Sequence, residues 1–176
     1  MANEKNRVPA TLIDYAVYRG NSRLIGTGDI TLPSIKSQTS EISGAGIGGA
    51  VELPVLGHFD SMTVQITFRT METSAAELMV PAAQDLVFRA SQQIYDGAGG
   101  QLNTEGIVVY CRAIAKGNEL GSLKPGEAMD GNVELEVLRL RVVKGGVEQY
   151  EIDKLNGIYR VLGVDYSAGV RADLGI

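Results

Sequence analysis

The sequence has 176 residues, of which 44% are hydrophobic, and this is enough for one domain with its own core. Its net charge of −5 argues against tight, non-specific binding to nucleic acid, because such binding needs a basic surface. A single cysteine excludes an internal disulfide framework. With no long apolar run and no signal-like start, we expect one domain over residues 1–176 that folds in a reducing cytoplasm.

The first third of the sequence predicts short strands separated by turns. We expect a loose arm over Met1–Ala10, a strand over Thr11–Tyr18 and a polar, extended segment over Ser34–Ser43. Ser43–Gly57 is rich in glycine and apolar residues, with little evident secondary structure. An apolar loop of this length is uncommon unless something covers it, so we predict that a partner subunit does.

The middle of the sequence predicts a one-sided strand, a short helix and two further strands. Met62–Arg69 alternates between apolar and polar residues, which is typical of a strand with one buried face. Ser74–Val80 has a capping-box pattern at its start and is followed by Pro81, which should end the helix. Strands are expected over Gln84–Tyr95 and Glu105–Lys116, and the second is apolar on both faces, as a central strand would be.

A long β-hairpin over Asn132–Asp153 is the clearest element of the sequence. Gly145 and Gly146 supply the two positive-φ positions of a tight turn. With this turn, Arg141 faces Tyr150 and becomes a diagonal neighbour of Glu148.

The apolar side chains of this hairpin change face between Val137 and Leu138. Such a change requires a bulge, or a strand that is buried on different sides at its two ends. After the hairpin, the tail Asp165–Ile176 is predicted to be extended or weakly helical. The whole pattern predicts a mainly β fold, a sandwich or barrel with one short flanking helix.

The residues that could carry chemistry do not form a catalytic pattern. The glycines of Ser43–Ala50 resemble a phosphate-binding loop, but no helix follows them. His58 and Cys111 are the only residues of their types, which excludes a Cys/His zinc cluster. Glu134 and Glu136 lie about 6.5 to 7 Å apart on one strand face, an arrangement that is usually a solvated surface. We therefore predict no enzymatic activity, no metal, no cofactor and no small-molecule substrate.

Two groups of sequence motifs point to a protein family more specifically than the composition or the strand pattern does. The first consists of Ile30–Ile35, Glu41 and the glycine-rich Gly44–Gly48. The second closes the chain with Tyr150–Asp153, Asn156-Gly157, Gly163–Asp165 and Gly169–Ile176. In this order they resemble the major tail tube protein of contractile-tailed bacteriophages and of R-type bacteriocins. The resemblance runs in register from about Leu12 to the end of the chain, and is weakest between Val80 and Glu105.

The resemblance implies a tail-tube fold whose copies form hexameric rings that stack into the inner tube of a contractile particle. This tube would be the conduit for DNA, or a membrane-piercing tube, driven through the host envelope when the sheath contracts. The implied partners are further copies, a sheath protein, a baseplate initiator, a tail terminator, a tape-measure protein and DNA that passes without tight binding. The implied location is the virion tail or a bacteriocin particle, assembled in the host cytoplasm. Alternatives are a secretion-system tube ring protein and a monomeric β-sandwich binding module.

The resemblance also suggests which residues contact other copies and which face the lumen. Contacts between subunits are expected in the Ser43–Gly57 loop and in the tail, at Gly44, Gly46, Ile47, Gly48, Gly49, Val51, Leu53, Asp165, Arg171, Asp173 and Leu174. For the lumen we expect one of two polar faces, formed either by Lys36, Gln38 and Ser40 or by Thr63, Gln65 and Thr67.

Overall fold

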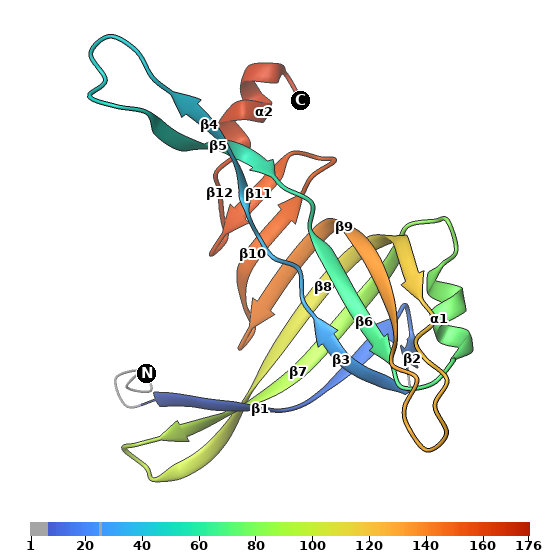
Figure 1. Ribbon diagram of the computed structural model, residues 1–176. Helices are drawn as coiled ribbons and strands as arrows, with labels where there is room; N and C mark the ends of the chain where they lie inside the picture. The colour runs from blue at the N-terminus through green and yellow to red at the C-terminus, as the bar shows by residue number, and fades with distance from the viewer. Residues whose placement is uncertain (1–6, 25) are drawn as a thin grey trace.

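The computed structural model describes residues 7–24 and 26–176, and these residues are mostly antiparallel β-structure (Figure 1). The strands are β1 (Arg7–Arg19), β2 (Ser22–Leu24), β3 (Thr27–Thr31), β4 (Ser37–Ile42), β5 (Val51–Phe59), β6 (Thr63–Phe68), β7 (Gln84–Asp96), β8 (Gln101–Glu119), β9 (Gly131–Lys144), β10 (Val147–Asp153), β11 (Ile158–Val161) and β12 (Val164–Asp165). The helices are α1 (Thr73–Leu78) and α2 (Ala168–Leu174). Within the described part of the chain, no helix is long and apolar enough to cross a membrane. The predicted mainly β fold is confirmed.

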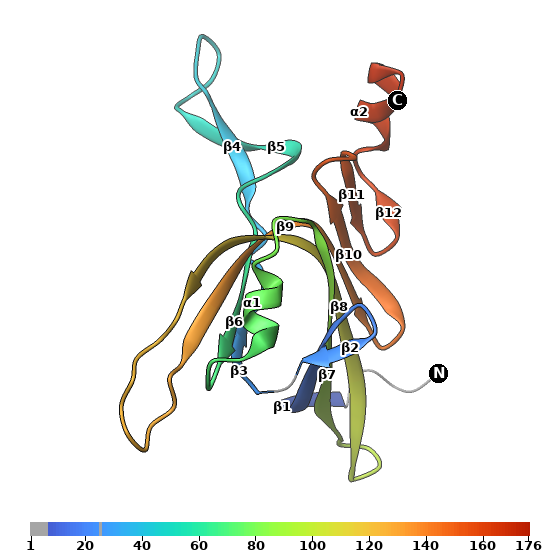
Figure 2. The ribbon, with the colours of Figure 1, turned by 90° about the vertical axis from the view of Figure 1, so that its right-hand side faces the viewer.

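Strand β9 lies where one ten-stranded sheet branches into two parts, which we describe as two sheets. Residues 131–136 pair with β6 and residues 139–144 pair with β10, while β8 pairs with both halves. We call β3, β6, residues 131–137 of β9 and residues 113–119 of β8 the four-stranded sheet. The large sheet has the order β12-β11-β10-β9-β8-β7-β1-β2. Figure 2 shows β8 and β9 arching from one sheet into the other, with α1 beneath the arch.

A bulge in β9 produces this change of sheet. On β8, Arg112 pairs with Arg139 and the next residue, Ala113, pairs with Val137, which leaves Leu138 as the extra residue. Before the bulge the buried residues are odd-numbered, up to Val137, and after it the buried residue is Leu140. The change of face predicted between Val137 and Leu138 is therefore confirmed as a bulge.

The core lies between the two sheets. Val64, Ile66 and Phe68 on β6 are fully buried while the residues between them stay partly exposed, which confirms the one-sided strand. Cys111 on the central strand β8 is buried in the same core, as predicted. Leu78 brings α1 onto the core.

The predictions for the N-terminal third are partly wrong. The strand β1 starts at Arg7, so residues 7–9 of the expected loose arm pair with β7, while residues 1–6 lie outside the described residues. Pro9 is tolerated because this part of β1 is an edge strand. Of the irregular connection predicted over Ser43–Gly57, residues 43–50 are irregular as expected, whereas residues 51–57 belong to β5, which pairs with β4. Together β4 and β5 form a two-stranded hairpin that projects from the body (Figures 1 and 2).

Three further local features differ from the predictions or decide between them. The capping box at Ser74 does not form, because the N-cap of α1 is Glu72 and no side chain caps the helix. The tail, predicted to be extended or weakly helical, takes the helical form as α2, which ends at Gly175 with a positive φ of 72°, so the fold has a second helix where only one was predicted. In the β9–β10 hairpin, Gly145 and Gly146 have the expected positive φ, but a bulge near Gln149 places Tyr150 opposite Val142 instead of Arg141.

We expect Ile66→Ala to lower the free energy of unfolding by about 2 to 5 kcal/mol, because Ile66 is fully buried and its removal leaves a cavity. Thr67→Ala on the same strand is the matched control, with an expected change within about 0.5 kcal/mol. Urea unfolding of the unassembled chain measures both. Equal losses for the two variants would contradict the placement of the core.

Candidate functional site

The four-stranded sheet has a polar face opposite the core. Thr63, Gln65 and Thr67 of β6 point away from the core, and each lies beside a polar residue of β9. The cross-strand partners are Glu136 for Thr63, Glu134 for Gln65 and Asn132 for Thr67, and Thr31 of β3 lies on the other side of Gln65. We call this the polar face.

The two glutamates of the polar face are held by lysines. Lys116 Nζ donates to Glu134 Oε1 at 2.8 Å, and Lys154 Nζ donates to Glu136 Oε1 at 2.9 Å. Burial opposes ionisation of Glu136, but hydrogen bonds from Ser61 and Lys154 outweigh it and hold the pKa of Glu136 below its usual value. A general acid needs a raised pKa, so this pair does not have the properties of a glycosidase site.

The four-stranded sheet has a free edge on each side. Within the described residues, β3 pairs only with β6. Beyond Ala113, β8 pairs with β9 on one side, because β7 begins opposite that residue. The backbone groups on the outer sides of both edges are therefore available to another strand.

The β4–β5 hairpin has an apolar face and an acidic face. Ile42 lies opposite Val51 and Ser40 opposite Leu53 on one face, and the apolar members of this set are 42–48% exposed. The tip carries the predicted contact residues Gly44, Gly46, Ile47, Gly48 and Gly49, all exposed.

On the other face of the hairpin, Glu41 lies directly opposite Glu52. A pair of strands without a third strand or a core is only marginally stable, and opposed like charges weaken it further. The two strands of this hairpin therefore contribute little stability by themselves.

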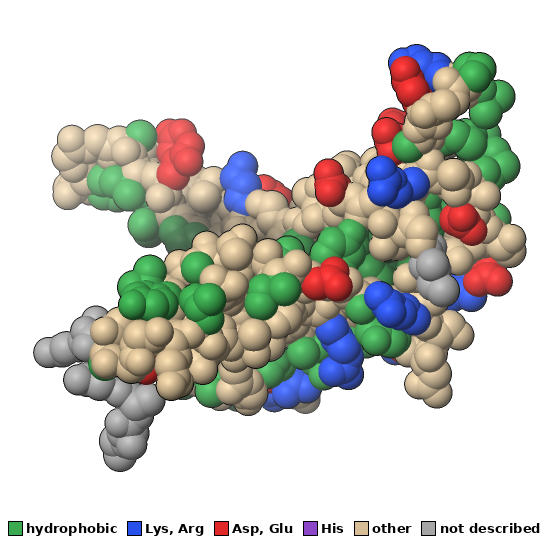
Figure 3. Space-filling view, turned by 90° about the horizontal axis from the view of Figure 1, so that it is seen from below, with side chains coloured by type: hydrophobic (Ala, Val, Ile, Leu, Met, Phe, Trp, Pro, Cys, Tyr) green, Lys and Arg blue, Asp and Glu red, His purple; other side chains and the backbone are tan. Residues whose placement is uncertain are grey.

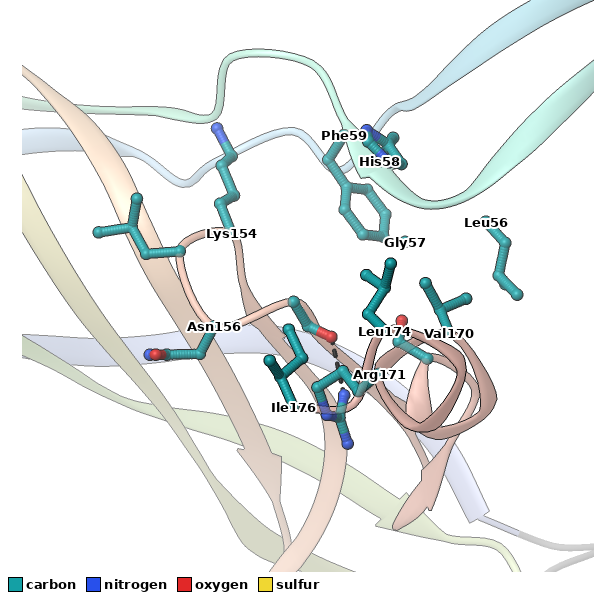
Figure 4. Close-up of a pocket in the computed structure, with 13 residues that line it drawn as sticks. Leu56, Gly57, His58, Phe59, Lys154, Asn156, Val170, Arg171, Leu174 and Ile176 are labelled. Atoms are coloured by element: carbon teal, nitrogen blue, oxygen red, sulfur yellow. Dashed lines mark hydrogen bonds between the residues drawn. The ribbon is translucent and has the colours of Figure 1, made fainter.

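The base of the hairpin packs against the C-terminal helix around a hollow of about 640 Å³ (Figure 4). Leu56 and Phe59 of β5 face Val170 and Leu174 of α2 across it. The backbone of Gly57 has a φ of +76°, and a Cβ there would lie 2.8 Å from Ser167 Oγ. Glycine is thus required where the hairpin meets the tail.

Ion pairs tie the predicted tail residues to the large sheet. Arg171 Nη2 lies 2.7 Å from Asp165 Oδ2, and Arg171 Nη1 donates to the Gly157 carbonyl oxygen at 2.8 Å. The hydrogen bond from Arg171 holds the pKa of Asp165 below its usual value. Asp173 and Leu174 are exposed on the same helix.

A buried carboxylate of β10 continues this network. Arg139 Nη2 and Arg160 Nη1 donate to the two oxygens of Glu151 at 2.5 and 2.7 Å. Burial opposes ionisation of Glu151, but the two guanidinium groups outweigh it and lower its pKa. The diagonal Arg141–Glu148 contact predicted from the hairpin is confirmed at 2.7 Å.

The family comparison adds to this geometry. Residues 9–175 match the family model described as phage tail tube protein FII. The chain belongs to this tail tube family. The match confirms the resemblance found in the sequence motifs, and no curated protein matches the chain.

Two solved structures that resemble this chain belong to an extracellular contractile injection system, PVC. The sheath/tube terminator in its extended state has a TM-score of 0.54 at 13% identity, covering 77% of this tail tube protein and 97% of the terminator. The sheath-tube complex in its extended state has a TM-score of 0.47 at 15% identity, covering 74% and 86% of the two chains. The terminator likeness shows that the fold is shared.

The predicted site residues of this tail tube protein fall in separate regions. Thr63, Gln65 and Thr67 lie together on the polar face, whereas Gln38 and Ser40 lie on the projecting hairpin, next to the exposed Lys36. His58 is exposed on β5. No group of metal-ligating side chains occurs in the described ranges, and burial raises the pKa of the Cys111 thiol to about 12.

A further exposed surface was not predicted. The start of β1, the end of β7 and the start of β8 form a projecting ribbon, over which hydrophobic side chains gather in Figure 3. Val8, Leu12, Tyr95 and Leu102 are exposed there. Val8, Tyr95 and Leu102 are brought together by the pairing of three strands, which no single stretch of sequence reveals.

We expect the stabilising effect of Glu151 to disappear in acid. Because folding lowers the pKa of Glu151 below 4.5, its contribution is complete above that pH and is lost as the pH falls through the folded-state pKa. Glu151→Gln should lower the free energy of unfolding by about 2 kcal/mol at pH 7, with the difference from wild type shrinking between about pH 5 and 3.

Urea unfolding of the unassembled chain across this pH range measures the effect. Glu127→Gln in the exposed loop between β8 and β9 is the matched control, and should change stability little at any pH. A difference for Glu151→Gln that stays constant from pH 7 to 3 would contradict the assignment.

Proposed function

We propose that this chain is the structural subunit of the inner tube of a contractile particle, a tube made of stacked hexameric rings. The observation that carries the proposal is the four-stranded sheet, which has the core on one face, polar side chains on the other and a free edge on each side. A sheet of this kind is complete only when another strand pairs with each edge.

The strand directions allow such a sheet to close into a ring. Its four strands alternate in direction, so the two edge strands, β3 and β8, run in opposite directions. A rotation about the ring axis keeps the direction of each strand relative to that axis. The β8 edge of one copy therefore meets the β3 edge of the next in antiparallel orientation, and the ring becomes a barrel without free edges.

The polar face is the lumen wall in this arrangement. It combines threonine, glutamine and asparagine with Glu134 and Glu136, so it offers DNA hydrogen-bonding groups and few free cations. Such a wall keeps a polyanion hydrated and does not hold it in place. The alternative face has Ser40 beside exposed Ile42 and Leu53, which suits a contact between proteins better than a water-filled channel.

The hairpin, the C-terminal helix and the projecting ribbon supply the remaining contacts between copies. All three carry exposed apolar residues, and surfaces of this kind are typical of obligate assemblies. Beyond further copies, the proposed partners are a sheath protein, a baseplate initiator, a tape-measure protein, DNA passing through the lumen, and a terminator. The fold shared with a sheath/tube terminator supports the last of these. The proposed location is the tail of the particle, assembled in the host cytoplasm.

Electron microscopy of the purified chain tests the proposal. We expect hollow tubes or six-membered rings of uniform diameter. Leu53→Asp should reduce the fraction of protein in tubes about tenfold or more, because an unpaired carboxylate buried in a contact costs more than about 1.4 kcal/mol. Leu123→Asp, at an exposed residue of the loop between β8 and β9, is the control for a general effect of added charge. A wild-type chain that remains monomeric at high concentration would contradict the proposal and favour a monomeric binding module.

Cysteine labelling tests the assignment of the lumen. Gln65→Cys places a thiol on the polar face, and Lys124→Cys places one on the exposed loop between β8 and β9. In intact tubes we expect a bulky maleimide to label the Lys124→Cys thiol at the rate seen in the unassembled chain, and the Gln65→Cys thiol much more slowly. Rapid labelling of Gln65→Cys in intact tubes would place the polar face on the outside.

A further inference from the structure

The large sheet carries a cluster of arginines on the face directed away from the core. Arg89 of β7, Arg112 of β8, and Arg139 and Arg141 of β9 lie on this face, because their neighbours along each strand are buried in the core. A hollow of about 320 Å³ lies between Arg112, Arg139 and Arg141, lined also by Asp85 and Tyr110. We call this surface the arginine face.

Two of these arginines lack a carboxylate partner among the described residues. Arg139 is bound to Glu151 and Arg141 to Glu148, whereas Arg112 makes no ion pair and Arg89 only lies 5.9 Å from the centre of the Tyr18 ring. Arg112 also lies directly opposite Arg139. Like charges in this position repel; Glu151 and Asp153 offset the charge of Arg139, whereas Arg112 has only Asp85, its cross-strand neighbour on β7, opposite it.

The acidic face of the hairpin carries two negative charges that have no cationic partner among the described residues. Glu41 and Glu52 lie opposite each other, are exposed, and form no ion pair with any described residue. Among the described residues, the chain thus presents two arginines without a carboxylate partner on one surface and two glutamates without a cationic partner on the projecting strand pair. A guanidinium group binds carboxylates through two parallel hydrogen bonds, which fits arginine on one side and glutamate on the other.

We propose that the acidic face of the hairpin of one copy docks on the arginine face of a copy in the adjacent ring, with Glu41 and Glu52 binding Arg112 and Arg89. This inference rests on the proposed function, and it identifies the two surfaces that join one ring to the next. The contact reduces the repulsion between Glu41 and Glu52 and the repulsion between Arg112 and Arg139. Because the two surfaces differ, the contact is head-to-tail and repeats without limit, which gives a tube with a direction.

Other occupants fit the arginine face less well. DNA carries closely spaced phosphates, so a duplex lying on this face would also meet Asp85 and the carboxylates of Glu148 and Glu151, whereas a pair of glutamates can contact the two unpaired arginines alone. A contact within one chain is excluded by the fold, because the hairpin projects away from the body (Figures 1 and 2).

Charge reversal on each surface tests the contact. The hairpin variant carries Glu41→Arg and Glu52→Arg, and the face variant carries Arg89→Glu and Arg112→Glu. All four residues are exposed, so both variants should keep the circular dichroism spectrum and Tm of the wild type. We expect each variant alone to form rings but to reduce the fraction of protein in long tubes at least about tenfold. Exposed charges elsewhere, in an Arg23→Glu, Glu127→Arg variant, should leave stacking unchanged.

Mixing the two variants provides the decisive measurement. In a mixture, the reversed hairpin of one variant meets the reversed face of the other, and the two remaining surfaces are unchanged, so alternating rings should stack again. Restored tubes in negative-stain images and in sedimentation support the contact.

Three results would overturn the inference: normal stacking of either variant alone, loss of stacking that mixing does not restore, or wild-type rings that never stack. If the face variant stacks normally but loses binding to a DNA duplex or to poly-glutamate, the face serves that partner instead. A wild type that forms neither rings nor tubes would instead contradict the proposed function itself.

Discussion

The architecture depends on one extra residue in one strand. The bulge at Leu138 moves the buried side chains of β9 from odd to even positions, so a single strand completes the four-stranded sheet at one end and the large sheet at the other. The Leu138 carbonyl oxygen accepts a hydrogen bond from the Lys154 backbone, so the bulge is held by the turn after β10. Without the change of face, either Val137 or Leu140 would lose its place in the core, and the polar face and the arginine face could not belong to one domain.

The surfaces proposed for assembly are the parts of the chain that lack a core of their own. The sheets enclose a core in which Ile66, Val133 and Leu135 are almost completely buried, whereas the β4–β5 hairpin has only its two strands. Local stability therefore ends at the base of the hairpin, where Gly57 meets Ser167. In the proposed tube, the exposed apolar residues of the hairpin are buried against other copies. Assembly then stabilises the folded hairpin, so the stability of this part of the chain depends on the concentration of subunits.

Sequence reasoning succeeded where a single strand carried the whole signal. The alternation in β6, the double-glycine turn and the change of face at Leu138 are local patterns, and each predicted its element. It failed at β5, because the glycines before Val51 obscured a short period-two pattern. The partners of Glu151 and the opposition of Arg112 and Arg139 depend on which strands pair and in which register. No single stretch of sequence contains that information, and the tail tube motifs supplied the function without supplying these contacts.

The charges of the proposed stacking contact have a physical role that apolar residues would not fill. Apolar surface binds at almost any angle, whereas a guanidinium group and a carboxylate bind in a defined orientation and therefore fix the rotation of one ring on the next. Each exposed ion pair contributes less than about 1 kcal/mol, but six equivalent contacts form together once two rings meet. Single contacts can therefore break and re-form while two rings adjust their relative rotation. Once all six contacts have formed, the rings dissociate slowly, because all of the contacts must break together. Stacking that rests on such contacts weakens as salt shortens the range of the charges, whereas closure of the ring by backbone hydrogen bonds does not.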